Sequence, residues 1–295
     1  MRITNNMLSQ NLLRNLELSQ GRVDQLQNQL SSGYRINRPS DDPVGIQNAM
    51  RLKSNISSVE QWKNNAAEAV DTMNTTESTL GDMTAMLQRV RELTVQGANG
   101  TLATVDKGAI ADEVDQISAQ LKMLANTQIG SKYIFSGTAT DKELITSGGT
   151  WQGNNQDIMF EVGNNLKLPI SVNGNNLFGD TPAIPSGVFT TLSALSADLR
   201  IGNSAGINNA LTNIDANINN VISIRSDLGA RTNRMTALQE QLDYTSTNLQ
   251  ANLSTIQDAD MAKTITDFTN QQNVYKAALS VGAKIIQPSL VDFMR

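Results

Sequence analysis

Residues 30–45 read LSSGYRINRPSDDPVG, and this stretch lies between two long helical patterns. Gly33 ends the first pattern, because glycine readily adopts the left-handed backbone that closes a helix. Asp42 and Pro43 begin the second pattern, since aspartate caps the free N–H groups of a first helical turn and proline fits its first position. We interpret the break as a hinge between a terminal helix and a longer helical body, formed by Gly33, Pro39, Asp41, Asp42 and Pro43.

Both ends of the chain carry apolar side chains at heptad spacing. The pattern occurs before the break and again in residues 257–295. Heptad spacing is typical of a helix that packs lengthwise on another helix. We therefore predict that the two ends pair as a coiled coil and form the assembly interface, through Leu12, Leu16, Val23, Leu26, Leu30, Ile265, Phe268, Tyr275, Leu279 and Ile286.

The middle of the chain combines long helical patterns with a short stretch of different character. Residues 141–187 are rich in glycine and proline, and Asn173-Gly174 predicts a β-hairpin turn. The predicted fold is mainly α: a long antiparallel helical rod or coiled coil built from both chain ends, with a small inserted β-rich domain at its tip. The predicted segments are the N-terminal coiled coil 1–40, the two rod halves 41–137 and 188–256, the β-rich domain 138–187 and the C-terminal coiled coil 257–295.

The composition excludes several classes of function. The chain has no cysteine and no histidine, which removes thiol and imidazole nucleophiles and zinc sites made from them. Its net charge of -5 provides no basic surface for nucleic acid. No apolar run is long enough to span a membrane, and the N-terminus does not resemble a cleaved signal peptide. We therefore expect no cofactor, no nucleic acid and no membrane partner.

Four carboxylates near the helix breaks are the candidates for a metal site. Asp41 and Asp42 precede one helical pattern, and Asp258 and Asp260 lie in a break before the last one. Helix capping is the favoured role of all four, because each stands where a helix begins or ends. A metal site made only of carboxylates stays open as the alternative, although the spacing of a calcium loop is absent.

An enzyme built on the β-rich domain is the competing class of function. Trp151 and Phe160 would be its substrate platform. Packing within a small β-core is the better explanation of these two aromatic side chains. We therefore expect a protein that is not an enzyme.

The amphipathic ends indicate helix–helix association. Their polar faces lack the excess of lysine and arginine that a membrane-surface helix carries. A two-helix seam without aromatic residues before Tyr34 is marginal on its own. We expect these ends to be disordered in a monomer and to fold when copies assemble.

Three stretches resemble the flagellin superfamily. Residues 30–37, followed by Asp41 and Asp42, resemble its N-terminal signature, and residues 87–96 resemble its second motif. Residues 256–262, which read IQDADMA, resemble its C-terminal motif. The three occur in the order of the family and cover both ends of the chain.

Within the superfamily the sequence is most similar to the hook–filament junction proteins, the hook-associated protein 3 family. Residues 38–43 (RPSDDP) resemble the junction-protein form, and flagellins usually lack these prolines. Residues 126–137 and 228–235 resemble the entry to the outer domain of that family and its return helix.

The resemblance implies a structural adaptor of the bacterial flagellum. Such a protein forms a ring of copies between hook-associated protein 1 and the flagellin filament. It is exported through the flagellar channel without a cleaved signal peptide, and a flagellar export chaperone holds its C-terminal helix beforehand. The alternative within the family is a minor flagellin that serves as a filament subunit.

Overall fold

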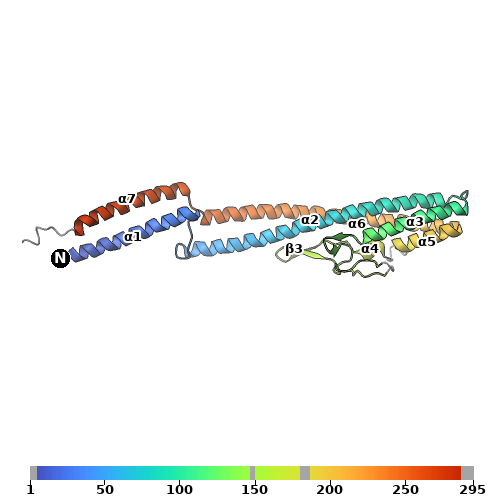
Figure 1. Ribbon diagram of the computed structural model, residues 1–295, viewed down its shortest axis with the longest axis horizontal. Coiled ribbons are helices and arrows are strands. Elements are labelled where there is room, and N and C mark those ends of the chain that lie inside the picture. Colours follow the sequence, from blue (N-terminus) through green and yellow to red (C-terminus); the bar gives the residue numbers. More distant parts are fainter. Residues whose placement is uncertain (1–4, 147–149, 180–186, 287–295) are drawn as a thin grey trace, which may run out of the picture. The chain divides into compact units, whose positions relative to one another are not determined.

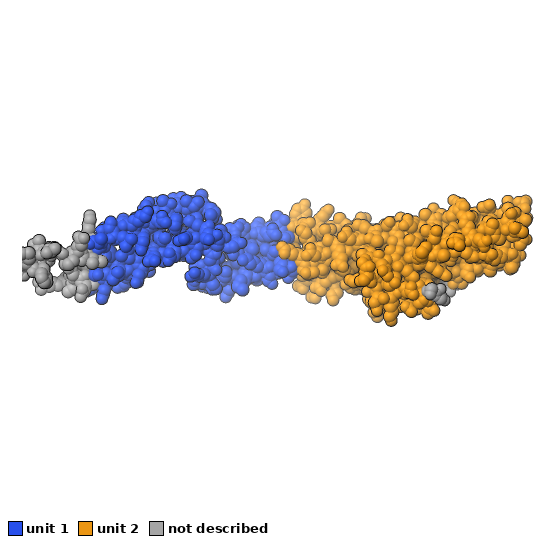
Figure 2. Space-filling view, viewed as in Figure 1, with its two compact units in different colours: residues 1–58, 245–295 blue, residues 59–244 orange. Residues whose placement is uncertain are grey.

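The structure is a computed structural model that describes residues 5–146, 150–179 and 187–286 (Figure 1). The chain divides into two compact units, unit 1 with residues 1–58 and 245–295 and unit 2 with residues 59–244 (Figure 2). Six of the helices are long: α1 (Asn5–Ser32), α2 (Pro43–Gly97), α3 (Thr104–Ala125), α5 (Val188–Ile201), α6 (Ser204–Gln257) and α7 (Met261–Ile286).

Helix α2 begins where the sequence predicts, and glycines lie at the ends of α2 and α5. The 55-residue helix α2 starts at Pro43 and ends at Gly97. A Cβ added at Gly97 would collide with the Cδ2 methyl group of Leu199, so α5 packs closely against α2 at this glycine. Helix α5 ends at Gly202, whose φ of 73° is left-handed.

Unit 2 contains an aliphatic core shared by α2, α3, α5 and α6. Its members are side chains on the inward face of each helix, at the helical spacing seen in the sequence. The almost completely buried side chains include Met73, Leu80, Met83 and Leu87 of α2, Leu121 of α3, Leu192 and Leu195 of α5, and Ile207 and Met235 of α6.

Ion pairs join the same helices at the surface of unit 2. Arg89 of α2 donates to Glu113 of α3 at 2.8 Å, and this hydrogen bond raises the pKa of Arg89. Arg91 of α2 pairs with Asp215 of α6 at 2.6 Å. These pairs are about half exposed, so each contributes little to stability and mainly fixes the register of the helices.

The inserted region of unit 2 holds two small antiparallel hairpins and a short helix. Strand β1 (Gln128–Ile129) pairs with β2 (Lys132–Tyr133), and β3 (Met159–Gly163) pairs with β4 (Leu166–Pro169). Asn165, with a φ of 59°, lies in the turn that joins β3 to β4.

The predicted hairpin turn at Asn173-Gly174 is wrong. Asn173 is instead the N-cap of helix α4 (Gly174–Phe178), and its side chain accepts a hydrogen bond from the backbone N–H of Asn175. Asparagine suits both positions, because its side-chain oxygen can satisfy either a turn or a helix start. The local pattern therefore does not distinguish the two.

The inserted region packs along the sides of two long helices. Asn65 of α2 donates to the carbonyl of Glu161 in β3 at 2.7 Å, and Asn220 of α6 donates to the carbonyl of Asn176 at 2.9 Å. These contacts lie away from the helix ends at Gly97 and Ser204, so within unit 2 the region is a side domain and not a tip. The mainly helical fold with a small β-rich insertion is confirmed.

Candidate functional site: the terminal helix pair and its junction

Helices α1 and α7 of unit 1 pack against each other in antiparallel orientation. Ser19 contacts Gln271, and Leu12 contacts Gly282, so positions rise along one helix as they fall along the other. The predicted α1 residues form the contacting face and are all half-buried: Leu12, Leu16, Val23, Leu26 and Leu30.

The face that α7 turns toward α1 differs from the predicted one. Phe268 and Tyr275 are half-buried, as expected for contact residues. Ile265 and Leu279 are 52% and 46% exposed, so their predicted packing on α1 is wrong. The side chain of Ile286 lies outside the described part of the structure. The predicted residues follow the most apolar stripe of α7. The contact face shares Phe268 and Tyr275 with that stripe, but its other members are smaller or more polar.

Polar and small residues fill the seam where α1 meets α7. Gln271 donates from Nε2 to the buried Ser19 hydroxyl at 2.9 Å, and Thr264 is also buried. A Cβ added at Gly282 would lie 2.9 Å from Cδ2 of Leu12, so the glycine allows a close approach of the two helices. An apolar heptad pattern does not reveal these residues, because serine, threonine, glutamine and glycine lie outside it.

Exposed apolar side chains flank the seam on α7. At 3.6 residues per turn, Ile265 and Leu279 lie on one side of the contact stripe, and Val274 and Val281 lie on the other. Val274 and Val281 are 56% and 52% exposed. On α1, Leu13 and Leu18 are likewise more than half exposed, at 52% and 57%. We call these six residues the outer apolar set.

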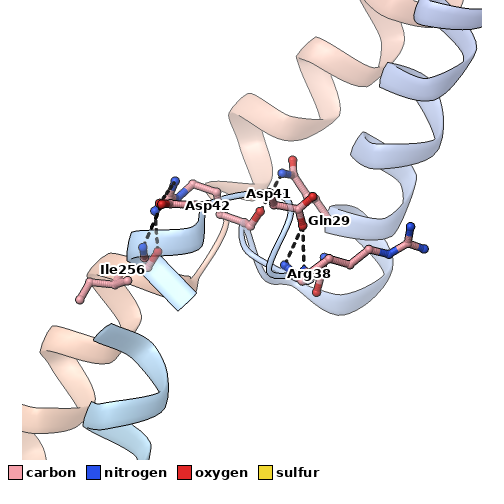
Figure 3. A network of polar contacts seen from close by, with 8 residues as sticks. Gln29, Arg38, Asp41, Asp42 and Ile256 are labelled. Carbon is pink, nitrogen blue, oxygen red and sulfur yellow. Dashed lines mark hydrogen bonds and ion pairs between the residues drawn. The ribbon is translucent and has the colours of Figure 1, made fainter. Parts of the chain in front are cut away.

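The connection between α1 and α2 is organised by two aspartates (Figure 3). Oδ2 of Asp41 accepts hydrogen bonds from the backbone N–H groups of Asn37 and Arg38, at 3.1 and 2.9 Å. Oδ1 of Asp42 accepts from the N–H of Gly45 at 2.9 Å, which is a helix cap. Gly33 has a φ of 74°, as its predicted role at the end of the helix requires.

The same connection is bonded to the link between α6 and α7. Arg35 donates from its backbone N–H to the carbonyl of Gln257 and from Nη2 to the carbonyl of Ile256, both at 2.7 Å. In return, Ala259 donates its N–H to the carbonyl of Gly33 at 2.9 Å. The connection is therefore a cross-linked junction within unit 1, and Ile36, only 1% exposed, is buried in it.

The other predicted hinge and metal candidates have local roles. Pro39 is exposed in the turn, and Pro43 is the first residue of α2. Asp258 accepts a hydrogen bond from the Ser254 hydroxyl, and Asp260 accepts one from the backbone N–H of Lys263, so it caps α7. Within residues 5–146, 150–179 and 187–286, no group of three or more metal-ligating acidic side chains occurs.

The aromatic candidates of unit 2 take part in packing. The ring of Trp151 lies 6.5 Å from that of Phe178, which in turn contacts Phe135 and Phe189. Phe160 lines a groove of about 790 Å³ beside α2. The nearest carboxylates of that groove are Glu68 and Asp71, both exposed.

Family comparisons agree with this architecture at both ends of the chain. The model of the bacterial flagellin N-terminal helical region matches residues 3–140, and that of the flagellin C-terminal helical region matches residues 211–294. This chain belongs to the bacterial flagellin family. As a member of that family, it is a structural protein of the flagellum.

The relatives of this flagellin-family chain include filament proteins. Flagellin FlaB1 of Treponema pallidum is 31% identical over 271 residues, which cover 90% of each chain. Flagellin of Bacillus subtilis is 30% identical, with 97% of each chain covered.

Solved structures of similar fold are junction and hook-associated proteins. The FlgL structure of Bacillus cereus is 25% identical, covers 69% of this chain and 99% of its own, and has a TM-score of 0.60. A putative flagellar hook-associated protein of Vibrio parahaemolyticus shares the fold with a TM-score of 0.68, at 21% identity and with 74% of this chain and 99% of its own covered. None of the described helices is long and apolar enough to cross a membrane.

Proposed function

We propose that this flagellin-family protein is the adaptor between hook and filament, forming a ring of copies between hook-associated protein 1 and flagellin. The observation that carries the proposal is the likeness to the FlgL structure of Bacillus cereus over 99% of that chain. The proline-containing stretch RPSDDP at residues 38–43 supports it, because it resembles the junction-protein form.

The outer apolar set provides the physical basis for assembly. Its six side chains remain exposed after α1 and α7 have paired. Fully burying one leucine, isoleucine or valine side chain yields about 1.5–3 kcal/mol. Contact with the terminal helices of neighbouring subunits would cover these residues, and the predicted interface residues Ile265 and Leu279 then contact other copies rather than α1.

The junction at residues 33–43 sets the direction in which the terminal pair leaves α2. Its hydrogen bonds to Ile256 and Gln257 hold the α1–α2 connection against the link between α6 and α7. We propose that this junction acts as the predicted hinge. Because its backbone groups are already hydrogen-bonded, its residues would move together and not one at a time.

The proposal includes the route to the flagellum. The protein is exported to the cell exterior without a cleaved signal peptide, after an export chaperone has held its C-terminal helix. The protein is not an enzyme, and it has no membrane or nucleic-acid partner.

A filament subunit is the second candidate function. The curated relatives favour it, because FlaB1 and the flagellin of Bacillus subtilis are about 30% identical over nearly the whole chain. Seeded polymerisation separates the two candidates: a filament subunit elongates into long filaments by itself, whereas a junction protein does not.

Deletion of the gene from its own host tests the junction role. If the protein is the adaptor, the deletion strain should secrete flagellin as shed monomers and build no filament. The full-length protein should restore filaments. A variant without residues 1–30 should be secreted and retain folded unit 2, yet fail to restore filaments. Normal filaments in the deletion strain would contradict the adaptor role.

A further inference from the structure

The turn between α2 and α3 contains one of the two Asn-Gly pairs in the chain. The pairs are Asn99-Gly100 and Asn173-Gly174. Asn99 and Gly100 are both exposed, and the carbonyl of Asn99 accepts the N–H of Leu102 at 3.3 Å, which closes the turn. The two pairs share a sequence but lie in opposite environments.

The side-chain amide of Asn99 is polarised by its neighbour Thr101. Oδ1 of Asn99 accepts hydrogen bonds from the backbone N–H of Thr101 at 3.2 Å and from its hydroxyl at 3.0 Å. Two donors on a carbonyl oxygen stabilise the negative charge that develops there when a nucleophile attacks the carbonyl carbon. The Asn99 amide is therefore prepared for attack.

The backbone nitrogen of Gly100 is the nucleophile within reach. Among the described residues, no hydrogen-bond acceptor holds the N–H of Gly100. Gly100 also has no side chain to obstruct the approach, and the space around it is open, because a Cβ built there would meet nothing within 4 Å.

The second pair has one donor on its amide oxygen instead of two, and its nucleophile is blocked. Oδ1 of Asn173 accepts the N–H of Asn175 at 3.0 Å. The N–H of Gly174, however, donates to the carbonyl of Phe135 at 3.0 Å, and both Asn173 and Gly174 are buried. The two pairs therefore differ in the freedom of the glycine nitrogen, in exposure and in the number of donors on the amide oxygen.

We propose that Asn99-Gly100 is a site of self-modification, at which the amide of Asn99 is converted into a carboxylate. The nitrogen of Gly100 attacks Cγ of Asn99, a C–N bond forms, the Cγ–Nδ2 bond breaks, and ammonia leaves with the proton lost by Gly100. Water then opens the cyclic imide at either carbonyl and yields aspartate or isoaspartate. Water is the only co-reactant, and no electrons are transferred.

The modification adds one negative charge to the turn. In the isoaspartate product the main chain also gains a methylene group, which changes the geometry between α2 and α3. Asn173 is preserved while the protein is folded, because the hydrogen bond of Gly174 must open before its nitrogen can attack.

Incubation of the full-length protein at mildly alkaline pH, followed by peptide mapping and enzymatic methylation of isoaspartate, tests the proposal. Tryptic peptides 92–107 and 168–200 report the two pairs separately. In the folded chain Asn99 should react more than about tenfold faster than Asn173, whereas in denaturant the two rates should converge. Gly100→Ala, which fits the open space, should abolish the rapid reaction without altering the circular dichroism spectrum.

Thr101→Val tests the polarisation of the amide. It retains the shape of the side chain but removes one donor, and should slow the reaction at Asn99 about fivefold, the factor for one ordinary hydrogen bond. The proposal is overturned if Asn99 persists in the folded chain as long as Asn173 does.

Discussion

The terminal helix pair of unit 1 and the four-helix part of unit 2 are both made of long helices, yet their contacts differ in kind. Unit 2 buries large aliphatic side chains almost completely, such as Leu80 and Leu195, each 0% exposed. The seam of α1 and α7 has leucines that are only half-buried, and its buried positions include Ser19 and Thr264.

The difference shows which helices the single chain can stabilise by itself. Burial of aliphatic surface supplies most of the free energy of folding, and a helix with a polar seam gains little of it. The terminal helices keep apolar side chains, such as Ile265 and Leu279, on surfaces that face away from the seam. We therefore expect other molecules to complete their stabilisation, and we expect unit 2 to fold without them.

The largest expected effect of a single substitution lies in the core of unit 2. Leu80→Ala should lower the free energy of unfolding by about 3 kcal/mol, because the cavity cannot close around a fully buried site. Both tryptophans, Trp62 and Trp151, belong to unit 2, so their fluorescence during urea denaturation measures this loss. Leu16→Ala in α1 is the matched control and should leave the fluorescence transition unchanged. Equal shifts for both variants would contradict the distinction between the units.

Gly282→Val should separate the terminal helices. The added side chain would enter the space of Leu12, and overpacking of this kind costs about 1–3 kcal/mol. The expected result is lower helix content by circular dichroism with unchanged tryptophan fluorescence. Gly21→Val is the control in the partner helix, where a Cβ meets nothing within 4 Å. If both variants lose the same amount of helix, the close approach at Gly282 is unimportant.

Asp41→Ala should weaken the junction of unit 1 by about 1–2 kcal/mol, since it removes the acceptor of two backbone N–H groups. Limited proteolysis with trypsin should then cleave the connection after Arg35 faster than in the unmodified protein. Asp24→Ala, on the exposed face of α1, is a control with the same loss of charge. Unchanged proteolysis of the Asp41 variant would show that other contacts hold the connection.

The smallest effect on the single chain is expected for the outer apolar set. Ile265→Ser with Leu279→Ser should change the unfolding of the monomer by less than about 0.5 kcal/mol, as is usual for exposed sites. The same double variant should fail to restore filaments in a deletion strain, because it lacks the apolar contacts between copies. Thr266→Ala with Ser280→Ala is the control on exposed polar positions of the same helix. If the variant with Ile265→Ser and Leu279→Ser restores filaments, these two residues are not part of the interface.

Much of the helical fold could be predicted from the sequence, because local signals and periodicity agree there. Pro43 and Gly97 bound α2 as their residue types indicate, and Leu192, Leu195 and Leu199 form the buried face of α5. On α7, Phe268 and Tyr275 of the contact face could be predicted. Its polar members, such as Gln271, could not, since Ile265 and Leu279 beside them are more apolar.

The junction illustrates the other limit of prediction from sequence. Asp42 was recognisable as a cap because its partner Gly45 is three residues away. The bond from Arg35 to Ile256 joins residues 221 positions apart, and no local pattern identifies such a pair. The family motifs at both ends of the chain contain these residues, but only the folded chain shows why they occur together.

Hydrogen exchange of the purified monomer, resolved by peptide, tests most directly whether the terminal helix pair is incomplete in the single chain. Amides of α1 and α7 should exchange through openings of less than about 3 kcal/mol, while those around Leu80 and Leu87 of α2 exchange only near global unfolding. Protection of α1 and α7 equal to that of the unit 2 core would contradict the account.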